Sequence, residues 1–325
     1  MTASRASATR RAATASVATA CLLLALKAYA LALTNSVAML GSLADSGLDL
    51  IAALVTLWAV RIAAAPADHD HRFGHGKAEA LAALFQVGLI AASAAAIVWS
   101  AVDRLFAGTA PAEPELGIGV SLAARAATYV LTAYQARVIR QTGSVAIRAD
   151  RAHYQADLLL NGAVIAALAL ETYAGLGGVD PLFGLAIAFW LGWNAARASG
   201  AAVNQLMDRE WPEARRRRFL AITMSHPANR GTHDLRTRTS GGHEFAQFHM
   251  WVDPALSVAE AHDVMDEIET ALKVDFPEVD VLIHVDPEGQ VDQPGNPLAE
   301  TVEPIEVAAL GKRGRRPRLL SKESR

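Results

Sequence analysis

Six long apolar runs dominate the first 205 residues of the chain and limit what it can fold into. They lie at roughly Ala13–Leu33, Val37–Arg61, Ala78–Ala101, Leu116–Val138, Ile147–Tyr173 and Pro181–Ala201. Each run reaches the ~20 residues that a helix needs to cross the hydrocarbon core of a bilayer. Since 52% of the 325 residues are hydrophobic and only 19% are charged, the sequence predicts an α-helical membrane protein with six transmembrane helices.

Basic residues are unevenly distributed between the segments that join these runs. Nearly all of them lie before the first run and around the joins after the second and fourth: Arg5, Arg10, Arg11, Arg61, Arg72, Lys77, Arg137, Arg140, Arg148 and Arg151. The opposite joins carry one basic residue, Arg104. Because cytoplasmic loops are enriched in Lys and Arg, this pattern predicts that both termini are cytoplasmic. The first run lacks a small-residue cleavage site, so we interpret it as a span rather than a signal peptide.

The composition changes after about Gln205, where charged residues become frequent and apolar runs shorten. The pattern there predicts a helix near 212–225, strands near 231–239 and 244–252, a helix near 257–276 and a strand near 279–285. This α-β-β-α-β order indicates a small, metallochaperone-like α+β domain in the cytosol. We therefore expect a cytoplasmic segment at 1–12, a six-helix transmembrane domain at 13–207, the cytosolic domain at 208–290 and a disordered basic tail at 291–325.

Two pairs of metal-ligating side chains interrupt the apolar runs. Asp45 and Asp49 in the second run, and His153 and Asp157 in the fifth, have the four-residue spacing that puts both side chains on one helix face. A carboxylate in hydrocarbon costs roughly 2.5–3.5 kcal/mol, so it needs a partner or a water-filled cavity. If the two helices pack together, three oxygens and one nitrogen converge. This set suits tetrahedral Zn²⁺ and also fits Fe²⁺, Mn²⁺ or Cd²⁺.

An alternative is that these side chains make ordinary polar contacts, satisfied by Lys27 of the first run or by buried water. Two i,i+4 pairs with acidic members exceed what helix packing requires, which favours the metal site. Its ligands must lose protons before they bind an ion, so binding releases protons and metal affinity rises with pH. This linkage is the physical basis for an exchange of protons for metal.

Two further groups of metal-capable residues lie outside the apolar runs. In the loop after the second run, Asp68, His69, Asp70, His71 and His75 place two carboxylates and three imidazoles within eight residues. Such tracts bind metal weakly and promiscuously, and a solvated loop is the alternative. In the cytosolic domain, metal-capable residues lie at strand ends and on one helix, where separate elements can converge: His233, His249, His262, His284 and Asp286.

The D-x-x-x-D and H-x-x-x-D pairs, the His-rich loop and the His-bearing domain together resemble the cation diffusion facilitator family, most closely its bacterial zinc and ferrous-iron efflux branch. The resemblance covers roughly residues 10–290. It implies a homodimer in the bacterial inner membrane that exports divalent metal in exchange for protons by alternating access. It also implies a transport site (Asp45, Asp49, His153 and Asp157), a loop site (Asp68, His71 and His75), a binuclear cytosolic site (His233, His249, His262, His284 and Asp286) and a charge interlock (Lys77 with Asp208).

Other functions are less compatible with the sequence. There is no Walker-type G-x-x-x-x-G-K-[ST] loop, which disfavours primary pumping. An intramembrane metalloenzyme would need an open metal position and a general base, and a membrane metal sensor would leave the intramembrane pairs unexplained. We expect a transporter rather than an enzyme, with Zn²⁺ as substrate and as a structural or regulatory ion, and with no organic cofactor and no nucleic-acid partner.

Overall fold

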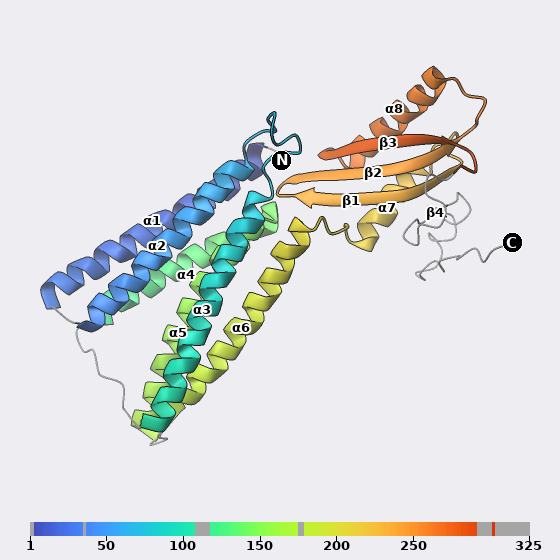
Figure 1. Ribbon diagram of the computed structural model, residues 1–325. Coiled ribbons are helices and arrows are strands. Elements are labelled where there is room, and N and C mark those ends of the chain that lie inside the picture. Colours follow the sequence, from blue (N-terminus) through green and yellow to red (C-terminus); the bar gives the residue numbers. More distant parts are fainter. Residues whose placement is uncertain (1–2, 35–36, 108–117, 175–178, 291–300, 303–325) are drawn as a thin grey trace. The chain divides into compact units, whose positions relative to one another are not determined.

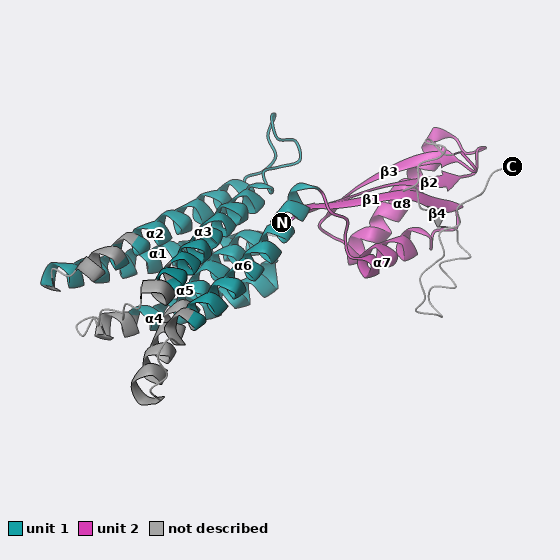
Figure 2. Ribbon diagram, turned by 60° about the horizontal axis from the view of Figure 1, so that its bottom comes forward, with its two compact units in different colours: residues 1–207, 240–242 teal, residues 208–239, 243–325 magenta. Residues whose placement is uncertain are grey.

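The structure is a computed structural model of the 325-residue chain, and it describes residues 3–34, 37–107, 118–174, 179–290 and 301–302. The chain divides into two compact units, which Figure 2 shows in different colours. The first unit comprises Met1–Met207 with Ser240–Gly242, and the second comprises Asp208–Thr239 with His243–Arg325.

Long helices make up the first unit. Within the described residues they are α1 (Ala3–Thr34), α2 (Val37–Ala63), α3 (Ala78–Ala107), α4 (Ile118–Thr142), α5 (Val145–Ala174) and α6 (Val179–Leu206). Each predicted apolar run overlaps one of these helices. A search limited to the described residues finds three stretches that are long and apolar enough to cross a membrane: Ser4–Leu33, Asp45–Ala63 and Ala78–Asp103.

Large apolar side chains lie on the outside of this helical unit. Trp99 and Phe189 expose 79% and 76% of their surface, and Leu33 exposes 70%. Contact of this apolar surface with water costs about 25 cal/mol per Å², whereas contact with hydrocarbon does not. The outer surface of the first unit therefore fits a lipid environment.

The helices of the first unit form two groups that converge at one end. In both views α1 and α2 run side by side, while α3, α5 and α6 form a second group (Figure 1, Figure 2). The two groups lie close together at the end that carries the 64–77 loop. Small residues permit this close approach, because Ala12 and Ala13 of α1, Ala59 of α2, Ala82 of α3 and Ala146 of α5 are at most 2% exposed.

The second unit is a small α+β domain. Its elements are α7 (Glu213–Thr223), β1 (Gly231–Ser240), β2 (His243–Val252), α8 (Val258–Asp275), β3 (Val279–Pro287) and β4 (Thr301–Val302). The sheet order is β3-β2-β1-β4, and β2 runs parallel to β3. Helix α8 provides the crossover that a parallel pair needs. The first five elements follow the predicted order of helices and strands.

Helix α8 begins where the sequence provides a capping box. The backbone N–H of Glu260 donates to Ser257 Oγ at 3.3 Å, and the backbone N–H of Ser257 donates to Glu260 Oε2 at 2.8 Å. Two backbone donors at the helix start are thereby satisfied. The observed helix lies within one residue of the predicted range at both ends.

One face of the sheet forms the hydrophobic core with the two helices. Phe248 and Met250 of β2 pack with Phe219 of α7 and with Ile268 and Leu272 of α8, and all five are at most 1% exposed. In a strand, successive side chains point to opposite faces. The residues of β2 that alternate with these core residues, among them His249, therefore belong to the other face.

The alternation breaks in β1 at Asp234, whose φ of 52° lies in the left-handed region. Asp tolerates this conformation better than most residues. Leu235 consequently joins the hydrophobic core, although His233, two residues earlier, contacts the histidines of the other face. This local irregularity brings His233 to the same place as the histidines of β2 and β3.

The predicted disordered tail lies mostly outside the described residues. Of residues 291–325, the structure describes Thr301 and Val302, which pair antiparallel with His233 and Thr232. A short strand at the edge of the sheet therefore occupies part of that segment.

Candidate metal centres

Three of the predicted intramembrane ligands meet between α2 and α5. Asp49 of α2 and His153 and Asp157 of α5 each offer one ligand atom, and these atoms lie within 4.8 Å of one another. His153 Nε2 is 2.9 Å from Asp49 Oδ1, and the side chain of His153 is 9% exposed. Because imidazole and carboxylate groups both ligate divalent cations, this geometry can hold a metal ion.

Asp45, the fourth predicted ligand, lies outside this group and is exposed. It precedes Asp49 by four residues, about one helical turn. Lys27, the alternative partner considered for the carboxylates, donates a hydrogen bond to the backbone carbonyl of Ser42 at 3.1 Å. The structure thus brings together three of the four predicted transport residues.

A buried polar network lies one helical turn from the Asp49–His153–Asp157 cluster. Asp150 of α5 is fully buried, and its Oδ2 accepts hydrogen bonds from Ser16 Oγ at 2.6 Å and from Gln135 Nε2 at 2.7 Å. Its Oδ1 accepts from Gln86 Nε2 at 3.0 Å, which is also 3.1 Å from Thr56 Oγ1. These five side chains come from α1 to α5. No residue of this network was predicted from the sequence as part of a site.

A second buried acid holds the beginning of α5. Glu79 of α3 is 3% exposed, and its Oε2 accepts a hydrogen bond from Ser144 Oγ at 2.6 Å. A negative charge at a helix N-terminus is favoured by the helix dipole. Glu79 therefore anchors the start of the helix that carries His153 and Asp157.

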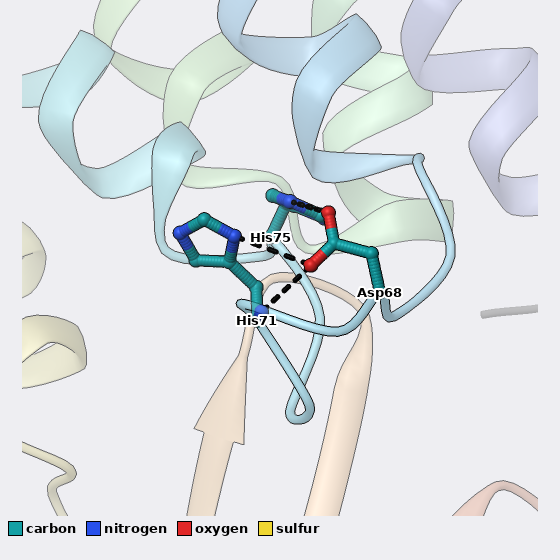
Figure 3. Close-up of side chains that lie close together, drawn as sticks. All are labelled: Asp68, His71 and His75. Carbon is teal, nitrogen blue, oxygen red and sulfur yellow. Dashed lines mark hydrogen bonds and ion pairs between the residues drawn. The ribbon is translucent and has the colours of Figure 1, made fainter.

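The loop between α2 and α3 holds a second metal-capable cluster (Figure 3). Asp68 Oδ1 is 3.4 Å from His71 Nδ1, and Asp68 Oδ2 is 3.2 Å from His75 Nε2. The backbone N–H of His71 donates to Asp68 Oδ1 at 2.7 Å and is the main cause that lowers the pKa of Asp68. Asp68 is thereby held as a carboxylate, the form that binds metal. The side chains of His69 and Asp70 are not members of this group.

In the second unit, three strands bring imidazoles to one buried carboxylate. Asp286 of β3 is 2% exposed. Its Oδ2 is 2.9 Å from His249 Nδ1 and 3.3 Å from His233 Nε2, and its Oδ1 is 3.2 Å from His284 Nε2. The strand register explains the convergence, because His249 stands opposite His284 and Trp251 stands opposite Asp286. The nitrogen and carboxylate donors fit the chemistry of a zinc site.

His262, the remaining predicted member of the cytosolic site, is not close to Asp286 within this chain. It lies on α8 with its side chain 64% exposed, and its Nε2 is 3.8 Å from Asp266 Oδ2. Helix α8 packs against the core face of the sheet, whereas the histidine cluster occupies the other face. The position of His262 in the binuclear site stays a prediction.

The two members of the predicted charge interlock belong to different units. Lys77 Nζ donates to the backbone carbonyl of Leu206 at 3.1 Å, at the end of α6. Asp208 Oδ2 is 3.8 Å from Arg238 Nη1 within the second unit. The interlock between Lys77 and Asp208 also stays a prediction.

Long apolar helices that enclose an Asp–His–Asp cluster, followed by a domain with a second His–Asp cluster, define a membrane protein that handles metal cations. The family model for the cation efflux transmembrane domain matches residues 13–207, and that for the cytoplasmic domain of cation efflux proteins matches residues 211–288. The chain belongs to the cation efflux family, the cation diffusion facilitators that its motifs resemble.

The chain is similar to relatives in this family over most of their length and of its own. The cation-efflux pump FieF of Pectobacterium atrosepticum is 42% identical over 282 residues, which cover 87% of this chain and 94% of that protein. FieF of Salmonella typhimurium is 42% identical over 285 residues, with 88% and 95% covered. A solved structure of CzrB is 38% identical and covers 24% of this chain and 99% of that chain, with a TM-score of 0.23. Family membership confirms the prediction of a transmembrane cation-efflux protein rather than an enzyme.

Proposed function

We propose that this chain exports divalent metal cations from the cytoplasm in exchange for protons, with Zn²⁺ as the preferred ion and Fe²⁺, Cd²⁺ and Mn²⁺ as further substrates. The observation that carries this proposal is the Asp49–His153–Asp157 cluster, which lies between two helices of the transmembrane domain. Similarity to proteins named cation-efflux pumps supports the direction of transport.

The cluster has the chemistry that such an exchange needs. Around a tetrahedral Zn²⁺, two ligand atoms at about 2.0–2.2 Å from the ion lie about 3.3–3.6 Å from each other. The 2.9 Å separation of His153 Nε2 and Asp49 Oδ1 is that of a direct hydrogen bond. An entering ion therefore replaces the shared proton and widens this pair by a few tenths of an ångström. Metal and proton compete for the same atoms, which couples their movements.

The proposed assembly is a homodimer in the bacterial inner membrane, with six spans and both termini in the cytoplasm. The match to the cytoplasmic domain of cation efflux proteins supports the dimer, and the basic loops support the orientation. Alternating access would move the helices so that the cluster faces each side in turn.

We assign the two clusters outside the helices to structural or regulatory ions rather than to the transported ion. Asp68, His71 and His75 all belong to one short loop, so they can bind an ion without moving helices. The cluster around Asp286 ties three strands together, and an ion there would hold β1, β2 and β3 in register. A membrane sensor would need only this last cluster, and a transport assay excludes or supports that alternative.

The test is transport into a defined compartment. The protein is reconstituted in vesicles that contain a metal-sensitive dye, and a pH gradient is imposed before Zn²⁺ is added outside. We expect proton-driven Zn²⁺ uptake by the wild type and near-background uptake by Asp49→Ala and His153→Ala. Asp103→Ala removes an exposed acid of α3 outside the cluster and serves as the matched control. Equal flux in wild type and both cluster variants would refute the proposal.

A further inference from the structure

Asp150 is a carboxylate that lies in the helical unit at the end where its helices converge. It is fully buried, and so are the side chains that contact it, Ser16, Gln86 and Gln135. Within the described residues, its hydrogen bonds come from hydroxyl and amide donors, which are neutral. Burial of a charge whose hydrogen-bond donors are all neutral is costly, and an acid in such surroundings commonly binds a proton instead.

The surroundings of Asp150 can accommodate both of its protonation states. Ser16 Oγ lies 2.6 Å from Asp150 Oδ2 and 3.2 Å from the backbone carbonyl of Ala12. When Asp150 is charged, the hydroxyl of Ser16 donates to the carboxylate. When Asp150 is protonated, its own O–H donates to Ser16 Oγ, and the hydroxyl of Ser16 turns to the carbonyl of Ala12. Every hydroxyl hydrogen has a partner in both states.

Two side-chain amide groups can also adapt to both protonation states of Asp150. Gln86 Oε1 and Gln135 Oε1 are buried and have no hydrogen-bond partner in the described part of the chain. Rotation of either amide by half a turn would direct an acceptor oxygen, instead of a donor, towards Asp150. Glu79, the other buried acid, lies farther from the metal cluster, because its partner Ser144 precedes His153 by nine residues, a rise of about 13 Å along the helix.

Asp150 is close enough to the metal cluster to respond to its charge. It precedes His153 by three residues, a rise of about 4.5 Å along the helix. The charged groups that act on it are His153 of the same helix and Asp49 of α2, while the side chains that face it from α1, α3 and α4 are the neutral Ser16, Gln86 and Gln135. A divalent ion bound between His153 and Asp49 adds positive charge next to Asp150 and favours its carboxylate form.

We propose that Asp150 is a proton-binding residue of the exchange reaction, protonated when the metal cluster is empty and deprotonated when a divalent ion binds there. The O–H bond of the carboxyl group breaks, the electron pair stays on the carboxylate, and the proton passes to water. Asp150 contributes no ligand to the metal. This inference rests on the proposed exchange of metal for protons and adds one proton site to it.

Calorimetry of Zn²⁺ binding to the full-length protein in detergent, repeated in buffers of different ionisation enthalpy, counts the protons released per ion. We expect Asp150→Asn to bind Zn²⁺ and to release fewer protons than the wild type, by up to about one proton per ion. Glu79→Gln, which neutralises the other buried acid, is the matched control and should keep the wild-type count. An unchanged count in Asp150→Asn would overturn the inference. If the wild type itself releases no protons, the proposed metal–proton exchange fails instead.

Infrared difference spectroscopy gives a second measurement that does not depend on the Asp150→Asn variant. The carbonyl stretch of a protonated carboxylic acid is separate from the amide bands, and its frequency depends on the hydrogen bond that the acid donates. We expect Zn²⁺ to remove such a band from the wild type, and Ser16→Ala to shift that band because the acceptor Oγ is lost. A band that Ser16→Ala leaves unshifted would contradict the role of Asp150.

Discussion

Asp286 should control how strongly zinc stabilises the cytosolic domain. The carboxylate is 2% exposed and lies within 3.3 Å of nitrogen atoms from His233, His249 and His284. An ion that binds only the folded domain stabilises it by RT ln(1 + [L]/Kd), which is about 2.7 kcal/mol at 100 times Kd. Asp286→Asn removes the charge and one ligand oxygen while it keeps the size of the side chain.

Hydrogen exchange followed by mass spectrometry can measure this stabilisation in the full-length protein. Amides of β2 that exchange by unfolding of the domain should be slowed about 100-fold by zinc at 100 times the wild-type Kd. If the substitution weakens binding about 1000-fold, the same zinc concentration stabilises the variant by less than about 0.1 kcal/mol, and the protection disappears. Asp280→Asn, at an exposed position of the same strand, is the matched control and should keep the protection.

Full protection of β2 by zinc in both Asp286→Asn and Asp280→Asn would refute the role of Asp286. That result would mean that the three histidines bind zinc without the carboxylate. Loss of protection in both variants would instead indicate a general loss of stability in β3. The amides of α3 and α6 provide an internal reference, because they belong to the other unit.

Three further predictions concern local features. The side-chain hydrogen bond from Ser257 lowers the pKa of Glu260, so the capping interaction is complete above the ordinary pKa of Glu and is lost as the pH falls through the lower value in the folded protein. Exchange at the start of α8, corrected for intrinsic rates, should therefore rise at acid pH in the wild type but not in Glu260→Gln. Asp234→Val should destabilise β1 by about 1–2 kcal/mol, because a β-branched residue disfavours the left-handed φ of 52°. Asp234→Gly should not destabilise β1, and denaturant-dependent hydrogen exchange of β1 measures both variants. Asp68→Asn should weaken metal binding at the loop at least about tenfold (~1.4 kcal/mol) and leave the intramembrane cluster intact. Metal titrations of Asp68→Asn with and without Asp49→Ala would separate binding at the two sites.

The sequence predicts the elements of the second unit well because each has a local signal. Ser257 and Glu260 mark the start of α8, and alternating residues of β2 mark its two faces. The metal cluster of that unit could be predicted only as a set of residues. Its geometry depends on the parallel pairing of β2 with β3 and on the left-handed Asp234, and neither is a local property of the strands.

In the first unit, helical spacing predicts which residues share a face but not how far apart two helices are at a given depth. The four-residue spacing puts Asp45 and Asp49 on one face of α2. In the structure, Asp49 belongs to the cluster with His153 and Asp157, and Asp45 does not. Asp150 was not predicted, although it precedes His153 by three residues on the same helix face. Its neutral hydrogen-bond partners, Ser16, Gln86 and Gln135, belong to three other helices, and no single segment of the sequence reveals them.

Asp45 is expected to complete the metal site through a movement of α2. Near the convergent end, α2 is tied to α3 by the hydrogen bond between Gln86 and Thr56, at 3.1 Å. Along the helix, Asp49 lies about 10 Å and Asp45 about 16 Å from Thr56. A pivot of α2 about this contact therefore moves Asp45 about 1.6 times as far as Asp49 towards α5. The pivot can thereby add Asp45 as a fourth ligand, with a smaller shift at Asp49.

This pivot predicts that Asp45→Ala weakens binding of Zn²⁺ at the intramembrane cluster at least about tenfold, although Asp45 is exposed and outside the cluster in this structure. Thr56→Val, which removes the hydrogen bond at the pivot but keeps the size of the side chain, should slow transport without removing a ligand. Calorimetry gives the affinities, and vesicle flux gives the rates. An unchanged Zn²⁺ affinity in Asp45→Ala would mean that the three-residue group is the complete site, and that α2 does not close on α5 when the ion binds.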